Sequence, residues 1–105
     1  MMAWILLLLA GLFEIAFTTA LRYTDGLSRP LPLLAFVVFA SISLYLLMKA
    51  SATIPLGTSY AVWTGIGAAG TVLAGIFYFD EPITTLRLLF LTALIGSIVG
   101  LKLVS

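Results

Sequence analysis

The feature that most constrains this chain is a single acidic residue inside a long apolar stretch. Glu14 is the only charged side chain among residues 1–21. The stretch is about 20 residues long, which is the length an α-helix needs to cross the hydrocarbon core of a bilayer. A carboxylate at the centre of such a helix costs about 2.5–3.5 kcal/mol on insertion scales, and charged residues at this depth face a bundle interior or a wet cavity. We therefore take Glu14 as the candidate functional centre.

The composition indicates an integral membrane protein and excludes several kinds of site. Hydrophobic residues make up 63% of the 105 residues and charged residues 9%, with no His and no Cys. These absences exclude disulfides, thiol nucleophiles, imidazole bases and the usual zinc sites. We expect no cofactor and no enzymatic activity, because one buried carboxylate offers too few catalytic groups. The formal net charge of +1 gives no basic patch, so we expect no nucleic-acid partner.

Four apolar segments separated by short polar turns predict an all-α membrane protein with a single domain, residues 1–105. The predicted spans are about residues 2–21, 32–48, 56–79 and 86–104. Turn-forming residues separate them, among them Gly26, Pro55 and Pro82. The first span is predicted to be a membrane helix rather than a cleaved signal peptide, because it has no basic n-region and contains Glu14.

The basic residues give the spans almost no preferred orientation. If the spans alternate in direction, one side of the membrane carries Lys49 and Lys102, and the other carries Arg22, Arg29 and Arg87. The positive-inside rule needs a clear excess of Lys and Arg on one side. We expect insertion in both orientations, with antiparallel pairing of two copies. The alternative is that the small excess of basic residues on one side still sets a single orientation.

The face of the first span around Glu14 carries small and aromatic residues. Helical spacing places Gly11, Phe17 and Thr18 on this face, and the small side chains let another helix approach closely. The first span offers no basic partner, so two subunits would bring two Glu14 carboxylates into one cavity, where they titrate as a coupled pair. Such a pair binds protons or a cation. The alternative is a structural carboxylate that only holds helices together.

The third span supplies candidate walls for this cavity. Tyr60 and Trp63 are three residues apart and share a helix face. Their rings attract cations, and a Tyr hydroxyl can donate to a carboxylate. The alternative is that these rings belong to an aromatic belt at the membrane interface.

Two pairs of glycines, one in the third span and one in the fourth, are candidate positions for helix movement or helix contact. Gly65 and Gly67 lie in mid-span, where they predict a hinge or a close helix contact. Gly96 and Gly100 are four residues apart and match the G-x-x-x-G pattern of associating membrane helices. We expect the first pair to form a hinge and the second pair to form a dimer contact.

Glu14, the run Gly57-Thr-Ser-Tyr-Ala-Val-Trp63 and the glycines that follow resemble the small multidrug resistance family over the whole chain. That resemblance implies a four-helix, proton-coupled exporter in the inner (plasma) membrane of a bacterium. It implies an antiparallel homodimer, or a pair of sister subunits. It also implies that the glutamate binds protons and substrate in competition, and that Tyr60 and Trp63 line the same site.

Within that family, Trp63-Thr-Gly-Ile-Gly-Ala68, Ser43 and Gly100-Leu-Lys102 resemble the guanidinium-exporter branch. The resemblance implies that Ser43 hydrogen-bonds the glutamate. Phe17 departs from the branch, which usually carries Trp three residues after the glutamate, and Phe lacks the indole N–H donor. The neighbouring Thr18 is similar to the multidrug branch instead.

The main hypothesis is a proton-coupled antiporter that exports guanidinium or a substituted guanidinium, with H⁺ and substrate competing at paired Glu14 residues. A planar guanidinium suits this site because it donates paired N–H bonds to a carboxylate. The first alternative is a polyspecific exporter of quaternary ammonium and aromatic cations. A second alternative, of another class, is a membrane scaffold or assembly subunit.

Overall fold

The computed structural model describes residues 2–26 and 28–104, and these residues form four helices without any strand. The helices are α1 (Met2–Arg22), α2 (Pro30–Ser51), α3 (Leu56–Tyr78) and α4 (Thr85–Val104). Each helix is long and apolar enough to cross a membrane. The predicted all-α membrane class is therefore confirmed.

Helix α2 is longer at both ends than the predicted span, residues 32–48. It begins at Pro30, because proline has no N–H to leave unpaired in the first turn of a helix. It continues past Lys49 to Ser51. The Lys49 ammonium lies 5.5 Å from the ring centroid of Tyr45, one turn earlier in the same helix, so the lysine packs over an aromatic ring within α2.

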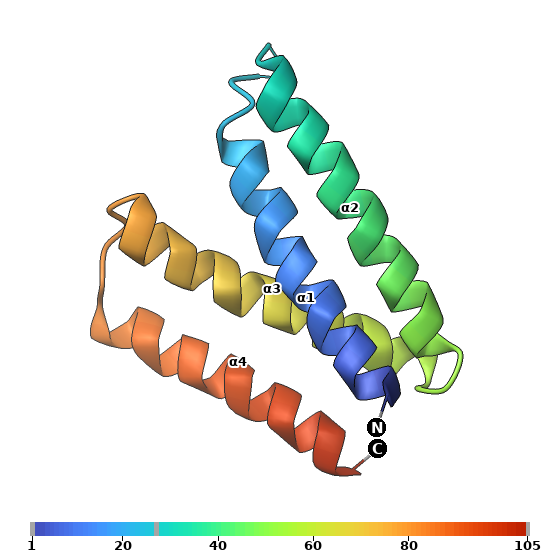
Figure 1. The fold of residues 1–105 in the computed structure, drawn as a ribbon. Coiled ribbons are helices and arrows are strands. Elements are labelled where there is room, and N and C mark those ends of the chain that lie inside the picture. The colour runs from blue at the N-terminus through green and yellow to red at the C-terminus, as the bar shows by residue number, and fades with distance from the viewer. Residues whose placement is uncertain (1, 27, 105) are drawn as a thin grey trace.

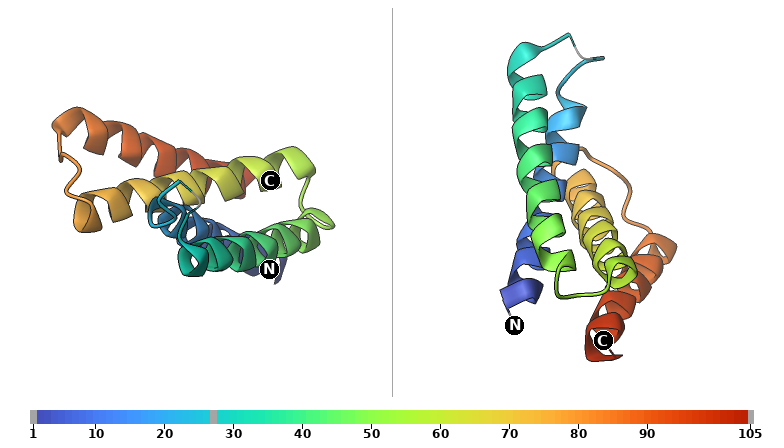
Figure 2. Two further views of the ribbon diagram at one scale, coloured as in Figure 1. Left: turned by 90° about the horizontal axis from the view of Figure 1, so that it is seen from above. Right: turned by 90° about the vertical axis from the view of Figure 1, so that its right-hand side faces the viewer.

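The four helices form two antiparallel hairpins that cross each other (Figure 1). Figure 2 shows the hairpin of α3 and α4 lying across one side of the hairpin of α1 and α2. The ends of α1 and α4 that are nearest the two termini lie at the same end of the molecule. The molecule is a flat slab with extents of 42 × 35 × 17 Å.

Helices α1 and α3 form the centre of the molecule, because α1 packs against α2 and α3, and α3 packs against all three other helices. Within the described part of the chain, the backbone of α4 runs beside α3 alone. Helix α4 is therefore an edge helix, and most of its apolar surface is exposed.

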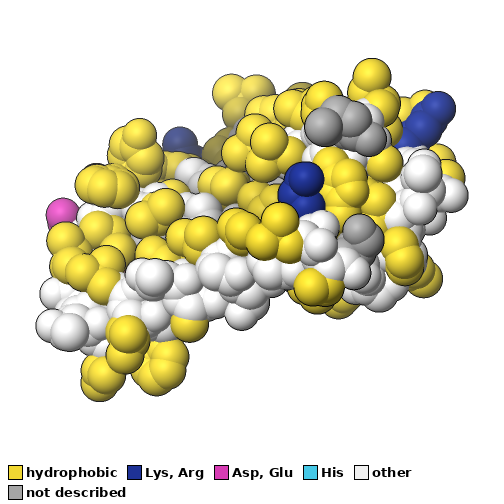
Figure 3. All heavy atoms as spheres, turned by 90° about the horizontal axis from the view of Figure 1, so that it is seen from below, with side chains coloured by type: hydrophobic (Ala, Val, Ile, Leu, Met, Phe, Trp, Pro, Cys, Tyr) yellow, Lys and Arg dark blue, Asp and Glu magenta, His cyan; other side chains and the backbone are white. Residues whose placement is uncertain are grey.

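Most hydrophobic side chains lie on the surface rather than in a core. The buried core gathers where α1, α2 and α3 meet and includes Leu7, Ala50, Ile54, Val62 and Trp63. Figure 3 shows a face on which hydrophobic side chains dominate and only isolated charged side chains are visible. In water such a surface would drive association. In a bilayer it is the expected lipid-facing or subunit-facing surface.

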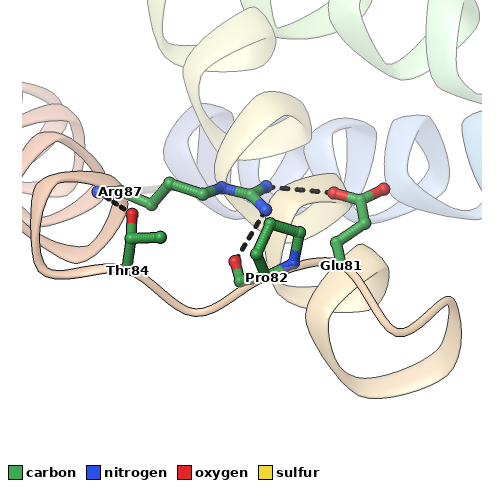
Figure 4. A network of polar contacts seen from close by, with 4 residues as sticks. All are labelled: Glu81, Pro82, Thr84 and Arg87. Carbon is green, nitrogen blue, oxygen red and sulfur yellow. Dashed lines mark hydrogen bonds and ion pairs between the residues drawn. The ribbon is translucent and has the colours of Figure 1, made fainter.

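A small polar network lies in the connection between α3 and α4 and in the first turn of α4 (Figure 4). The Thr84 hydroxyl accepts the Arg87 backbone N–H at 3.1 Å, which is an N-cap contact and explains why α4 begins at the next residue. The Arg87 guanidinium donates to the Pro82 carbonyl at 2.8 Å and to the Glu81 carboxylate at 3.0 Å. Because this ion pair is partly exposed to solvent, it contributes little to the stability of the fold.

Candidate functional site

Glu14 lies half-buried between α1 and α3, with its carboxyl group directly against the backbone of Gly67. A Cβ atom at position 67 would overlap this carboxyl group, so the contact depends on glycine. Within the described residues, Glu14 Oε1 is buried and has no hydrogen-bond partner. An acceptor oxygen in this state can bind a proton or the N–H of a cation.

The same interface has further glycines on both helices, each in contact with an isoleucine of the other helix. A Cβ at Gly11 of α1 would lie 2.5 Å from Ile66 Cγ2, and one at Gly70 of α3 would overlap Ile15. Residue numbers rise together along α1 and α3 in these contacts, so the two helices run in the same general direction. Small residues therefore let α1 and α3 approach closely on both sides of Glu14.

Ser43 on α2 lies beside Ala10 of α1, one turn before Glu14, and it does not bond to the carboxylate. The Ser43 hydroxyl is fully buried and donates to the Ala10 carbonyl oxygen at 2.7 Å. It also accepts the Trp63 Nε1–H at 2.9 Å. The expected hydrogen bond from Ser43 to Glu14 is therefore wrong for this structure, since the single hydroxyl proton is used on the α1 backbone.

Tyr60 and Trp63 are brought together, as the shared helix face predicts. Their ring centroids are 5.7 Å apart at 53°. Trp63 is only 9% exposed, whereas Tyr60 is 56% exposed. Ser43 thus links Trp63 to α1, and the Tyr60 ring extends the aromatic surface to the outside of the chain.

Phe17 and Thr18 follow Glu14 but face different helices. Phe17 packs edge-on against Phe36 of α2, with ring centroids 5.5 Å apart. The Thr18 hydroxyl lies 2.9 Å from the Glu14 carbonyl oxygen and 2.8 Å from Thr71 Oγ1 of α3. Phe17 therefore belongs to the α1–α2 contact in this chain, and Thr18 to the α1–α3 contact that contains the carboxylate.

The predicted hinge glycines lie in an unbroken helix. Helix α3 continues through Gly65 and Gly67, and both residues are buried against neighbours. A Cβ at Gly65 would lie 2.8 Å from Ile98 Cδ1 of α4, just as Gly67 contacts Glu14. These contacts support the close-packing interpretation; the hinge itself stays a prediction.

The predicted dimer-contact glycines lie on an open face of α4. A Cβ at Gly96 or Gly100 would meet nothing within 4 Å in the described chain. The space beside them would accommodate another helix, but a dimer contact at this place stays a prediction.

Sequence reasoning did not assign Thr71 to the site. Thr71 lies four residues after Gly67, as Thr18 lies four residues after Glu14, so both hydroxyls are one turn further along their helices. This matched spacing is a signal in the sequence. The spacing indicates a Thr18–Thr71 contact only once Gly67 of α3 is known to lie opposite Glu14 of α1.

Replacing Ser43 by Ala is expected to loosen the contact of α2 and α3 with α1. The variant leaves the Trp63 N–H without its acceptor and removes the bond to the Ala10 carbonyl. Because interhelical hydrogen bonds in membrane proteins average about 0.6 kcal/mol each, we expect a loss of roughly 1 kcal/mol in unfolding free energy. Unfolding in mixed micelles measures this loss. Ser41→Ala is the control, because the Ser41 hydroxyl bonds only to Val37 of its own helix.

Comparisons with known proteins agree in family and in length. The family model described as Small Multidrug Resistance protein matches residues 2–95. The chain is 45% identical over 102 residues to a guanidinium exporter of Salmonella typhimurium strain LT2, covering 97% of both chains. It is 44% identical over 104 residues to a guanidinium exporter of Yersinia pseudotuberculosis, covering 99% of this chain and all of the relative.

These matches extend over nearly the whole length of the chain and include all four helices. Together with the four apolar spans, they place the chain in the inner membrane of a bacterium as a multi-pass protein. The chain belongs to the small multidrug resistance family.

Proposed function

We propose that the chain is a proton-coupled antiporter that exports guanidinium or a substituted guanidinium, and that it catalyses no covalent reaction. The observation that carries the proposal is the buried Glu14 oxygen, which lies near the middle of helix α1 without a hydrogen-bond partner in the described residues. The guanidinium exporters to which the chain is similar support the choice of substrate.

The chemistry of this substrate fits a carboxylate held in an apolar interface. A guanidinium ion is planar and presents paired N–H donors that match the two oxygens of a carboxylate. A proton neutralises the same carboxylate, so either H⁺ or the cation occupies Glu14 but not both. The site binds H⁺ or the cation but not both, and it opens to one side of the membrane at a time. Export of the cation is therefore coupled to entry of H⁺.

Two copies in antiparallel orientation would complete the site. In the described residues, the only ion pair joins Arg87 to Glu81, so Glu14 gains no basic partner within one chain. The open face of α4 at Gly96 and Gly100 supports a contact with a second copy. The near-equal number of basic residues on the two sides supports insertion in both orientations.

Alternating access would require α3 to move against α1. Gly67, which contacts Glu14 of α1, and Gly65, which contacts Ile98 of α4, are the residues of α3 that we propose for this movement, because a helix bends more easily at glycine. We propose that these residues allow the movement that exposes Glu14 first to one side of the membrane and then to the other.

Reconstitution in liposomes tests the proposal. We expect a guanidinium gradient to drive a proton-coupled transport current and tetraethylammonium to drive none, because a quaternary ammonium has no N–H donor for the carboxylate. Comparable currents with both cations would support a polyspecific exporter. Absence of both current and proton-coupled flux with either cation would contradict the proposed transport by this chain; flux is read as well because exchange of one H⁺ for one monovalent cation moves no net charge.

A further inference from the structure

A pair of hydroxyl groups joins α1 directly to α3 next to Glu14. Thr18 Oγ1 and Thr71 Oγ1 are 2.8 Å apart. Thr18 Oγ1 is also 2.9 Å from the Glu14 carbonyl oxygen and 3.1 Å from the Ile15 carbonyl oxygen. When Thr18 donates to its own backbone, Thr71 is the donor across the interface. Among the described residues, it is the only hydrogen bond between a side chain of α1 and a side chain of α3.

The pair has a counterpart on the other side of the carboxylate. Thr18 lies four residues after Glu14, and Ala10, whose carbonyl accepts the Ser43 hydroxyl, lies four residues before it. Thr71 likewise lies four residues after Gly67 on α3. The contact between Glu14 and Gly67 is thus flanked on both sides: by the Thr18–Thr71 bond on one side, and on the other by Ser43 of α2, which bonds to the Ala10 carbonyl of α1 and to the Trp63 Nε1–H of α3.

The flanking contacts fix which part of α3 faces the carboxylate. If α3 moved by one turn along α1, about 5.4 Å, a different residue would lie opposite Glu14. Gly67 could not then accommodate the carboxyl group, because the space for it exists only at a residue without Cβ. The hydroxyl pair therefore opposes loss of the register that the site needs.

We propose that Thr71 is a positioning residue for Glu14, and that it acts through Thr18. For its part in transport this inference rests on the proposed function. Thr71 does not contact the carboxylate; it holds α3 in register so that the carboxyl group stays on Gly67. Interhelical hydrogen bonds of membrane proteins shift an equilibrium by about threefold on average. A bond of this strength can bias the register and still break when α3 moves.

Carboxyl NMR tests the inference without any substrate. The chain has only two glutamates, Glu14 and Glu81, so glutamate labelled with ¹³C at the side-chain carboxyl gives two signals. We expect Thr71→Val, which keeps the side-chain shape and removes the hydroxyl, to shift the Glu14 signal and leave the Glu81 signal in place. Thr71→Ser, which keeps the hydroxyl, is expected to retain the wild-type signal. An unshifted Glu14 signal in Thr71→Val would overturn the inference.

Two further variants separate positioning from a general effect on folding. Thr18→Val removes the same bond from the other helix, so it is expected to give a shift similar to that of Thr71→Val. The double variant Thr18→Val with Thr71→Val is expected to shift the Glu14 signal no further than either single variant, because each single variant already removes the bond. Thr92→Val is the matched control, because the exposed Thr92 hydroxyl bonds only to Leu88 of its own helix. A Glu14 shift in the Thr92 variant would show a non-specific effect and contradict the inference.

Transport gives a second readout. Thr71→Val is expected to raise the KM for guanidinium about threefold per inserted molecule, the size of one interhelical hydrogen bond. A merely structural role would lower the amount of inserted protein and leave the KM unchanged. If the wild-type chain carries no guanidinium, the proposed function fails, and the NMR signal of Glu14 still decides the role of Thr71.

Discussion

Replacing Glu14 by Gln is expected to abolish proton-coupled guanidinium transport while leaving the four helices folded. The amide has nearly the same shape as the carboxyl group and therefore fits against Gly67. It cannot release a proton or neutralise a cation. Because removing one partner of a buried charge pair costs about 3–5 kcal/mol, we expect at least about a 100-fold loss of guanidinium binding. Binding to detergent-solubilised protein and current in liposomes measure the two losses.

Glu81→Gln is the matched control for this experiment. Glu81 carries the same carboxyl group but pairs with Arg87 in an exposed connection. An exposed ion pair contributes about 0–1 kcal/mol, so transport and folding are both expected to stay close to wild type. Undiminished transport by Glu14→Gln would contradict the antiporter. A wild-type chain that folds and carries no cation would instead favour the scaffold alternative.

The helices could be predicted from sequence because the bilayer fixes their length and polarity. Four apolar segments of about 20 residues admit few other arrangements, so the fold class followed from hydropathy. The ends of α2 were harder to predict. Pro30 and Lys49 both look like turn residues, yet one is tolerated in a first helical turn and the other covers Tyr45.

The composition of the site was predictable to the extent that it depends on a single helix. Spacing along α1 correctly places Thr18 beside Glu14, and spacing along α3 places Tyr60 beside Trp63. Spacing does not say which residue of α3 lies opposite Glu14. For this reason the contact with Gly67 and the bond to Thr71 were not predicted, and Ser43 was assigned the wrong partner.

Replacing Gly67 by Ala is expected to disrupt the site through its contact with Glu14. The added Cβ would overlap the carboxyl group, so either the carboxylate must move or α3 must shift away from α1. Overpacking of this kind costs about 1–3 kcal/mol, which, if it falls on the bound site, corresponds to a loss of guanidinium affinity of about 5- to 150-fold. Binding measured by calorimetry on the solubilised protein checks this result.

Gly57→Ala is the control on the same helix, because a Cβ at position 57 would meet nothing within 4 Å. Alanine also favours helix over glycine, so this variant is expected to bind guanidinium normally and to be at least as stable as wild type. The comparison separates the two interpretations of Gly67. A residue that acts only as a hinge would, when replaced, slow turnover and leave equilibrium binding unchanged. A residue that makes room for the carboxylate would, when replaced, weaken binding itself, and normal binding by Gly67→Ala would contradict the contact with Glu14.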